Sequence, residues 1–111
     1  MKGFGDKYKK HKGKESNSSA KVTNDQILKH ALKEHLNGNL SEAAKYYEIL
    51  INQGFNDPRI FSNYAAIFQQ EGKIDKAIEF YKKSIELFPK RPEAYSNLGL
   101  ILKNQGNLNE A

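Results

Sequence analysis

Two asparagines at equivalent positions of an internal repeat are the residues best suited to bind a ligand. Asn63 and Asn97 are separated by one full repeat, and Lys29 stands at the corresponding place one repeat earlier. An amide side chain offers both a hydrogen-bond donor and an acceptor, so stacked asparagines can pair with the backbone of an extended peptide whatever its sequence. The alternative is that asparagine merely suits an exposed helical position there.

No group of residues in the chain has the type and spacing of a catalytic site. The sequence contains no glycine-rich phosphate loop and no nucleophile elbow. It contains no cysteine, which excludes a disulfide framework, a thiol nucleophile and a zinc–thiolate site. His30 and His35 are five residues apart and fall on different sides of a helix, so we expect a semi-buried His30, a solvated His35 and no metal site. We therefore expect no enzyme activity in this segment and no cofactor.

The elements that must position the asparagines repeat with a constant period of about 34 residues. The period relates Gly38, Gly72 and Gly106; Leu40, Ile74 and Leu108; Ala43, Ala77 and Ala111; and Tyr47 and Tyr81. A fixed period of this length is typical of a solenoid of helix pairs.

The residues at these positions resemble the tetratricopeptide repeat family. They are Phe61, Tyr64, Ala65, Phe68, Gly72, Ala77, Tyr81 and Pro89, followed by Tyr95, Leu98, Gly99, Leu102, Gly106 and Ala111 in the next copy. The resemblance covers about residues 24–111 and implies an all-α fold, a right-handed superhelical solenoid of antiparallel helix pairs with about two and a half repeats. We expect a disordered basic leader at 1–22, a divergent first unit at 24–57, a second unit at 58–91 and a truncated third unit at 92–111.

Residues that favour helix ends mark the boundaries within these units. Thr23 and Gln26 have the spacing of a capping box, and Asp57 followed by Pro58 predicts the start of another helix. We expect the first helix to stop at Asn37-Gly38, the second unit's first helix at Gly72 and its second helix at Pro89. Ser41, Asp75 and Asn109 are related by the same period, and we expect them to cap the second helix of each unit.

Apolar residues at helical spacing predict how the helices pack. In the second unit we expect Phe61, Tyr64, Ala65 and Phe68 to face Ile74, Ala77, Ile78, Tyr81 and Ile85. Ala65 and Ala77 are small enough for the two backbones to approach closely. The first unit has His30 and Glu34 in place of aromatic or aliphatic residues, which predicts a polar N-terminal cap.

The resemblance also implies a ligand groove along the first helix of each unit. The residues projected into it are Lys29, Arg59, Ser62, Asn63, Ala66, Gln69, Gln70, Glu93, Ser96, Asn97, Leu100, Lys103 and Asn104. The asparagine pair resembles the asparagine ladder of the repeats attached to O-linked sugar transferases. A carboxylate clamp of the chaperone-binding kind is not expected, because Leu28, Leu32 and Glu93 stand where lysine and asparagine would be needed.

Two functions fit these expectations. The first is a protein-interaction module whose partner is a protein or peptide held in the groove. The second is the substrate-recruitment arm of a larger glycosyl-, sulfo- or methyltransferase, since bacterial proteins that resemble this chain often continue into such a domain. The short third unit suggests a fragment of a longer array.

The positive charge of the chain lies in its first residues. Seven lysines and two acidic residues in the first 23 positions account for the whole net charge of +5. A polyanion or anionic-lipid contact through residues 2–21 is one interpretation, and a solubilising leader is the other. The chain has neither a long apolar run nor a signal peptide, so we expect no membrane span and a cytoplasmic location. The sequence does not specify an oligomeric state.

Overall fold

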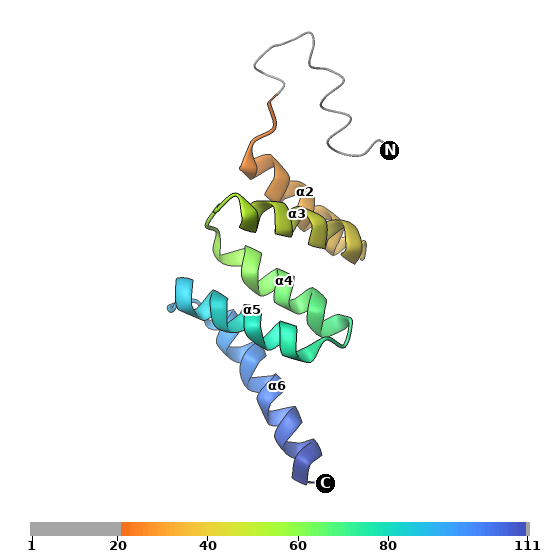
Figure 1. Cartoon of the computed structure of the whole chain (residues 1–111), viewed down its shortest axis with the longest axis vertical. Coiled ribbons are helices and arrows are strands. Elements are labelled where there is room, and N and C mark those ends of the chain that lie inside the picture. Colours follow the sequence, from red (N-terminus) through yellow and green to blue (C-terminus); the bar gives the residue numbers. More distant parts are fainter. Residues whose placement is uncertain (1–20, 111) are drawn as a thin grey trace.

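The chain folds into stacked antiparallel helices (Figure 1). The structure is a computed structural model that describes residues 21–110, with the side chains of residues 21–106, so the expected basic leader lies almost entirely outside the described residues. The helices are α2 (Asn24–Leu36), α3 (Leu40–Asn52), α4 (Pro58–Gln70), α5 (Ile74–Leu87) and α6 (Pro92–Glu110). Over the described residues all regular structure is helical, which confirms the all-α fold, and the stacked pairs fit the expected solenoid.

Two helices, α2 and α4, begin with the capping interactions that the sequence predicts. Thr23 and Gln26 form the capping box, with the Thr23 hydroxyl accepting from the Gln26 amide at 3.1 Å and the Gln26 side chain accepting from the Thr23 amide at 2.9 Å. Asp57 caps α4 through the Arg59 amide at 2.9 Å, and Pro58 occupies the first turn. Both predictions are confirmed.

The expectation that Ser41 and Asp75 cap the second helices is wrong, because α3 and α5 already begin at Leu40 and Ile74. The preceding helices end in a tight turn in which Gly38 and Gly72 have φ values of 83° and 82°, a backbone conformation that favours glycine. In this turn the Asn39 and Lys73 amides bond back to the Glu34 and Phe68 carbonyls. Helices α3 and α5 therefore each begin one residue before the polar residue that was expected to cap them.

Helix α6 corrects a second expectation. It runs from Pro92 to Glu110 without a break at Gly106, whereas the period predicts an end there as at Gly72. Asn109 accordingly lies within a helix and does not cap one. In each of the first two units the chain reverses at the glycine, and the second helix packs against the first. Among the described residues no helix packs on this part of α6, so its backbone hydrogen bonds continue through Gly106 as one helix.

The buried side chains form two cores that meet at α4. The N-terminal core joins α2, α3 and one side of α4, and contains Ile27, Leu28, Ala31, Ala43, Tyr46, Tyr47, Leu50, Ile60 and Ile67. The C-terminal core joins α4, α5 and α6, and contains Ala65, Ala77, Tyr81, Ala94 and Ile101. Ala65 and Ala77 are fully buried together as expected, whereas Ile60 and Ile67 were not anticipated because they lie on the other side of α4.

Aromatic rings fill the space between α4 and α5. Phe80 stacks on Phe61 at 6.1 Å and on Phe68 at 5.5 Å between ring centroids, and Tyr64 lies 5.0 Å from Phe80. The Lys76 ammonium sits over the Phe68 and Phe80 rings. The four rings join the two helices of the second unit through offset and tilted contacts.

In the first unit, polar side chains take the place of these aromatic contacts between the two helices. His30 meets the Tyr46 ring edge-on at 4.8 Å, and Glu34 lies 3.8 Å from His30 while accepting a hydrogen bond from Asn39 at 2.6 Å. The expected roles of the two histidines are reversed, because the His30 side chain is 44% exposed and His35 is half-buried against α3.

Candidate ligand-binding face

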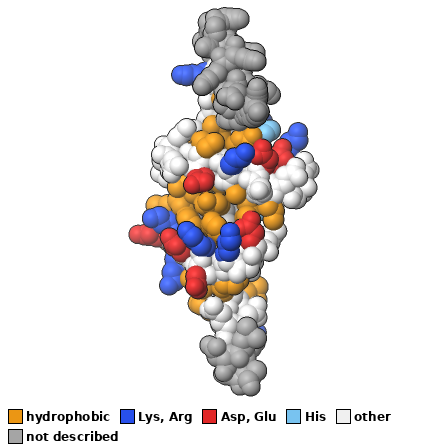
Figure 2. Space-filling model, turned by 45° about the vertical axis from the view of Figure 1, so that its right-hand side comes forward, with side chains coloured by type: hydrophobic (Ala, Val, Ile, Leu, Met, Phe, Trp, Pro, Cys, Tyr) orange, Lys and Arg blue, Asp and Glu red, His pale blue; other side chains and the backbone are white. Residues whose placement is uncertain are grey.

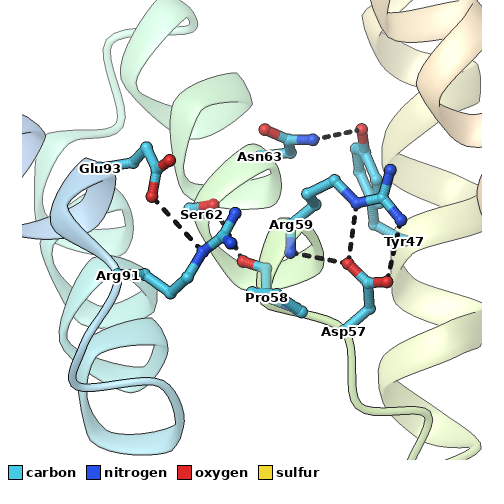
Figure 3. A network of polar contacts seen from close by, with 8 residues as sticks. All are labelled: Tyr47, Asp57, Pro58, Arg59, Ser62, Asn63, Arg91 and Glu93. Carbon is cyan, nitrogen blue, oxygen red and sulfur yellow. Dashed lines mark hydrogen bonds and ion pairs between the residues drawn. The ribbon is translucent and has the colours of Figure 1, made fainter.

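The hydroxyl of Tyr47 holds one of the two asparagines in place. Tyr47 comes from α3 and is fully buried, and Asn63 comes from the middle of α4. The Asn63 Nδ2 group donates to the Tyr47 hydroxyl at 3.2 Å (Figure 3). Burial raises the pKa of Tyr47 to about 12, although the Asn63 hydrogen bond acts in the opposite direction. Tyr47 is therefore a neutral phenol, and its hydroxyl can accept from Asn63 while donating elsewhere.

His35 supplies the second partner of the same hydroxyl. Its Nδ1 atom lies 3.0 Å from the Tyr47 oxygen, and the two rings meet edge-on at 5.8 Å. Since Asn63 already donates to the oxygen, the arrangement that uses every group has the Tyr47 O–H donating to a neutral imidazole. Burial lowers the pKa of His35, which favours that neutral form.

An equivalent set of contacts occurs one repeat later. The Tyr81 hydroxyl donates to Gln69 Oε1 at 2.9 Å, and a hydrogen bond with Asn97 lowers the pKa of Tyr81 against the larger, raising effect of burial. We call His35, Tyr47 and Asn63 the first tyrosine cluster, and Gln69, Tyr81 and Asn97 the second. Each joins both helices of one unit to the first helix of the next.

A pair of oppositely charged residues lies next to the first tyrosine cluster. Arg59 donates to both carboxylate oxygens of Asp57, from Nε at 2.9 Å and from Nη2 at 3.0 Å (Figure 3). These hydrogen bonds lower the pKa of the Asp57 carboxyl, against a smaller opposing effect of burial. At the start of α6, Arg91 Nε lies 3.6 Å from a Glu93 carboxylate oxygen. Both arginines thus have an acidic partner close at hand.

The predicted groove residues differ in how far they are free to meet a ligand. Five are partly buried: Ser62, Asn63, Ala66, Gln69 and Asn97. The exposed ones are Lys29, Arg59, Gln70, Glu93, Ser96, Leu100, Lys103 and Asn104. Of the partly buried ones, Gln69 is directed to Tyr81 and the Ser62 hydroxyl donates to the Pro58 carbonyl at 3.3 Å.

Sequence reasoning missed the contacts that hold the asparagines. The repeat step between Tyr47 and Tyr81, and between Asn63 and Asn97, was visible in the sequence. The same step also relates His35 to Gln69, but the two residue types differ, so the sequence does not mark them as equivalent. Both side chains carry a nitrogen or oxygen atom that can accept a hydrogen bond, and both lie at the same position in the first helix of their unit.

The described residues hold neither a cluster of three metal-ligating side chains nor a helix suited to span a membrane. Among these residues no three histidine or acidic side chains come together as they would around a metal ion. None of the described helices has the length and apolar content needed to cross a membrane. Lysine, arginine and carboxylate side chains are intermixed on the face shown in Figure 2.

Comparison with known proteins agrees with the geometry. Residues 65–106, from the middle of α4 to Gly106 in α6, match the family model described as TPR repeat. No curated protein matches the chain. Repeats of this family generally mediate protein–protein interactions and are typically not catalytic. Residues 65–106 therefore carry the tetratricopeptide repeat, and the helix pairs and constant repeat period of the described residues fit the same repeat.

Proposed function

We propose that the chain binds an extended segment of another polypeptide along a face formed by α2, α4 and α6. The observation that carries the proposal is that Asn63 and Asn97 occupy equivalent positions in successive units and are both held by a buried tyrosine. Both amides remain partly exposed, so a ligand can still reach them. Amides at regular intervals suit the backbone of an extended chain, which repeats its own donors and acceptors.

The tyrosine contacts support binding by reducing its entropic cost. A free asparagine loses side-chain freedom when it binds, and immobilising a side chain costs about 0.5–1.5 kcal/mol. Asn63 is already hydrogen-bonded to Tyr47 before any ligand arrives. Exposed groove residues such as Gln70, Ser96 and Lys103 would add contacts that depend on the ligand sequence. On this proposal the units are 24–57, 58–91 and 92–111, the first being the polar cap.

The alternative is a substrate-recruitment arm of a larger transferase. It gives the described helices the same task, since the arm would also have to hold a polypeptide. The two proposals differ only in what happens to the bound segment. No contact among the described residues favours the transferase arm, whereas the two held asparagines favour a binding module.

The proposed function is tested with peptides selected from a random phage-displayed library on the full chain. Binding of a selected peptide is measured by fluorescence anisotropy. Replacing Asn63 and Asn97 together by alanine should weaken it roughly tenfold or more, since each lost hydrogen bond is worth about 0.5–1.5 kcal/mol. Asn52→Ala, at an exposed position near the end of α3, is the matched control. Equal affinity of the double variant and the control would refute the role of the asparagines.

A further inference from the structure

The two tyrosine clusters differ at one position, and the difference decides whether they respond to protons. In the second cluster the Tyr81 hydroxyl donates to Gln69 Oε1, an acceptor at every pH at which the protein is folded. In the first cluster the acceptor is His35 Nδ1, 3.0 Å from the Tyr47 oxygen. An imidazole nitrogen accepts a hydrogen bond only while it carries no proton.

Protonation of His35 leaves the Tyr47 hydroxyl without its acceptor. The imidazolium Nδ1–H becomes a donor and points at an oxygen that already accepts from Asn63. Tyr47 is fully buried, so its O–H group cannot turn to bulk water without a structural change. The Asn63 side chain, which also meets the hydroxyl, is the group that can supply an acceptor. Rotation of its amide brings Oδ1 to Tyr47 in place of Nδ2.

We propose that proton uptake by His35 reverses its hydrogen bond with Tyr47 and turns the Asn63 amide, whereas Asn97 keeps its orientation. Asn63 would then offer a different edge of its amide to a ligand at acidic pH. The rearrangement of the first tyrosine cluster stands by itself, and only its effect on affinity rests on the peptide-binding function proposed above.

The charged and titratable groups around His35 determine the pH at which it takes up a proton. On α2 the neighbouring Glu34 is directed to His30 and Asn39. From α3 the facing group is Tyr47, and from α4 the charge that acts on that tyrosine is Arg59, which is paired with Asp57. Burial lowers the pKa of His35, so its protonation takes place below the usual value of 6.5.

The experiment follows the side-chain amide signals of Asn63 and Asn97 by ¹⁵N–¹H NMR between pH 7.5 and 5. Four forms of the full chain are compared: the parent, His35→Gln, His30→Gln and Gln69→His. His35→Gln copies the second cluster into the first, and Gln69→His does the reverse. His30→Gln removes the neighbouring imidazole, which contacts Tyr46 rather than Tyr47. Far-UV circular dichroism at each pH reports whether the helices persist.

The proposal expects the Asn63 signals of the parent to titrate with a midpoint below 6.5, while those of Asn97 stay constant. The titration should be lost in His35→Gln, kept in His30→Gln and acquired at Asn97 in Gln69→His. If the parent loses helicity on acidification, His35→Gln should retain it. An Asn63 signal that does not titrate, or a titration or helix loss unchanged in His35→Gln, overturns the proposal.

Binding of the selected peptide separates this proposal from the proposed function. If both hold, affinity changes by roughly tenfold across the His35 titration, the equivalent of one hydrogen bond, and is constant over the same range in His35→Gln. If the Asn63 amide titrates but its replacement by alanine leaves peptide affinity unchanged, the proton response stands and the proposed function fails.

Discussion

Two equivalent glycines should respond to the same substitution with opposite signs. Gly72 and Gly106 occupy the same position in successive repeats, and an added Cβ would meet nothing within 4 Å at either position. Neither substitution would cause a steric clash, so the backbone conformation of each glycine decides whether alanine raises or lowers the stability. Gly72 has a φ of 82°, whereas Gly106 lies within α6 and is not among the glycines with positive φ.

The size of each effect follows from these conformations. Alanine in a left-handed conformation costs about 1–2 kcal/mol, so Gly72→Ala should lower the melting temperature by roughly 4–15 °C for a domain of this size. Alanine within a helix is more favourable than glycine by about 0.5–1 kcal/mol, so Gly106→Ala should raise the melting temperature by a few degrees at most. The smaller size of the second effect also reflects fraying near the helix end.

Thermal unfolding followed by circular dichroism at 222 nm measures both effects. Gly99→Ala is the control, because Gly99 lies in the middle of α6 and also has open space around it. It should raise the melting temperature and so show that the assay detects a more stable α6. A lower melting temperature for Gly106→Ala, together with a higher one for Gly99→Ala, would show that α6 breaks at Gly106 and would refute the reasoning.

Three further predictions concern packing, hydrogen bonding and pH. Ala77→Leu should lower the free energy of unfolding, measured by urea titration, by about 1–3 kcal/mol, because Ala77 is fully buried between α4 and α5 and a larger side chain overpacks the contact. Ala66→Leu, on the partly exposed side of α4, is the control and should change this free energy little. Tyr47→Phe should cost about 1–2 kcal/mol in that assay, since it removes two hydrogen bonds at a buried hydroxyl. Arg59 lowers the pKa of Asp57 below 3.8, so the pair contributes stability above that pH and loses it as pH falls through the folded pKa; in Arg59→Gln the Asp57 carboxyl should titrate closer to 3.8 by ¹³C NMR.

Each of these predictions has an outcome that contradicts it. Equal urea midpoints for Ala77→Leu and the parent would mean that the contact between α4 and α5 has unused space. An unchanged stability for Tyr47→Phe would mean that the hydroxyl contributes nothing to the link between units. An Asp57 carboxyl that titrates at the same pH with and without Arg59 would assign its lowered pKa to another cause.

The helices and their order could be predicted from sequence because local signals agree with the period. Thr23 with Gln26 and Asp57 with Pro58 start helices, and each does so through its own side chain or ring with little help from distant residues. The helix starts at Leu40 and Ile74 could not be predicted in the same way. They are determined by how the preceding turn closes its backbone hydrogen bonds, and this leaves Ser41 and Asp75 inside the helix.

The candidate site could be predicted only in part. The period identifies Asn63 and Asn97, but the contacts that orient them depend on which atoms meet across three helices. A histidine and a glutamine look unrelated in a sequence, and their common role appears only when both are seen to face a tyrosine hydroxyl. Residue type thus suggested a ligand chemistry to propose, while packing revealed how the side chains are held.

Helix α4 has a consequence for how the molecule opens. Its Ile60 and Ile67 belong to the N-terminal core, and its Ala65 belongs to the C-terminal core. In a linear array, one end can melt while the other stays folded if the units are only loosely coupled. Because α4 cannot leave one core without exposing the other, amide hydrogens from α2 to α5 should exchange with solvent in a single cooperative event, while the last turns of α6 exchange on their own.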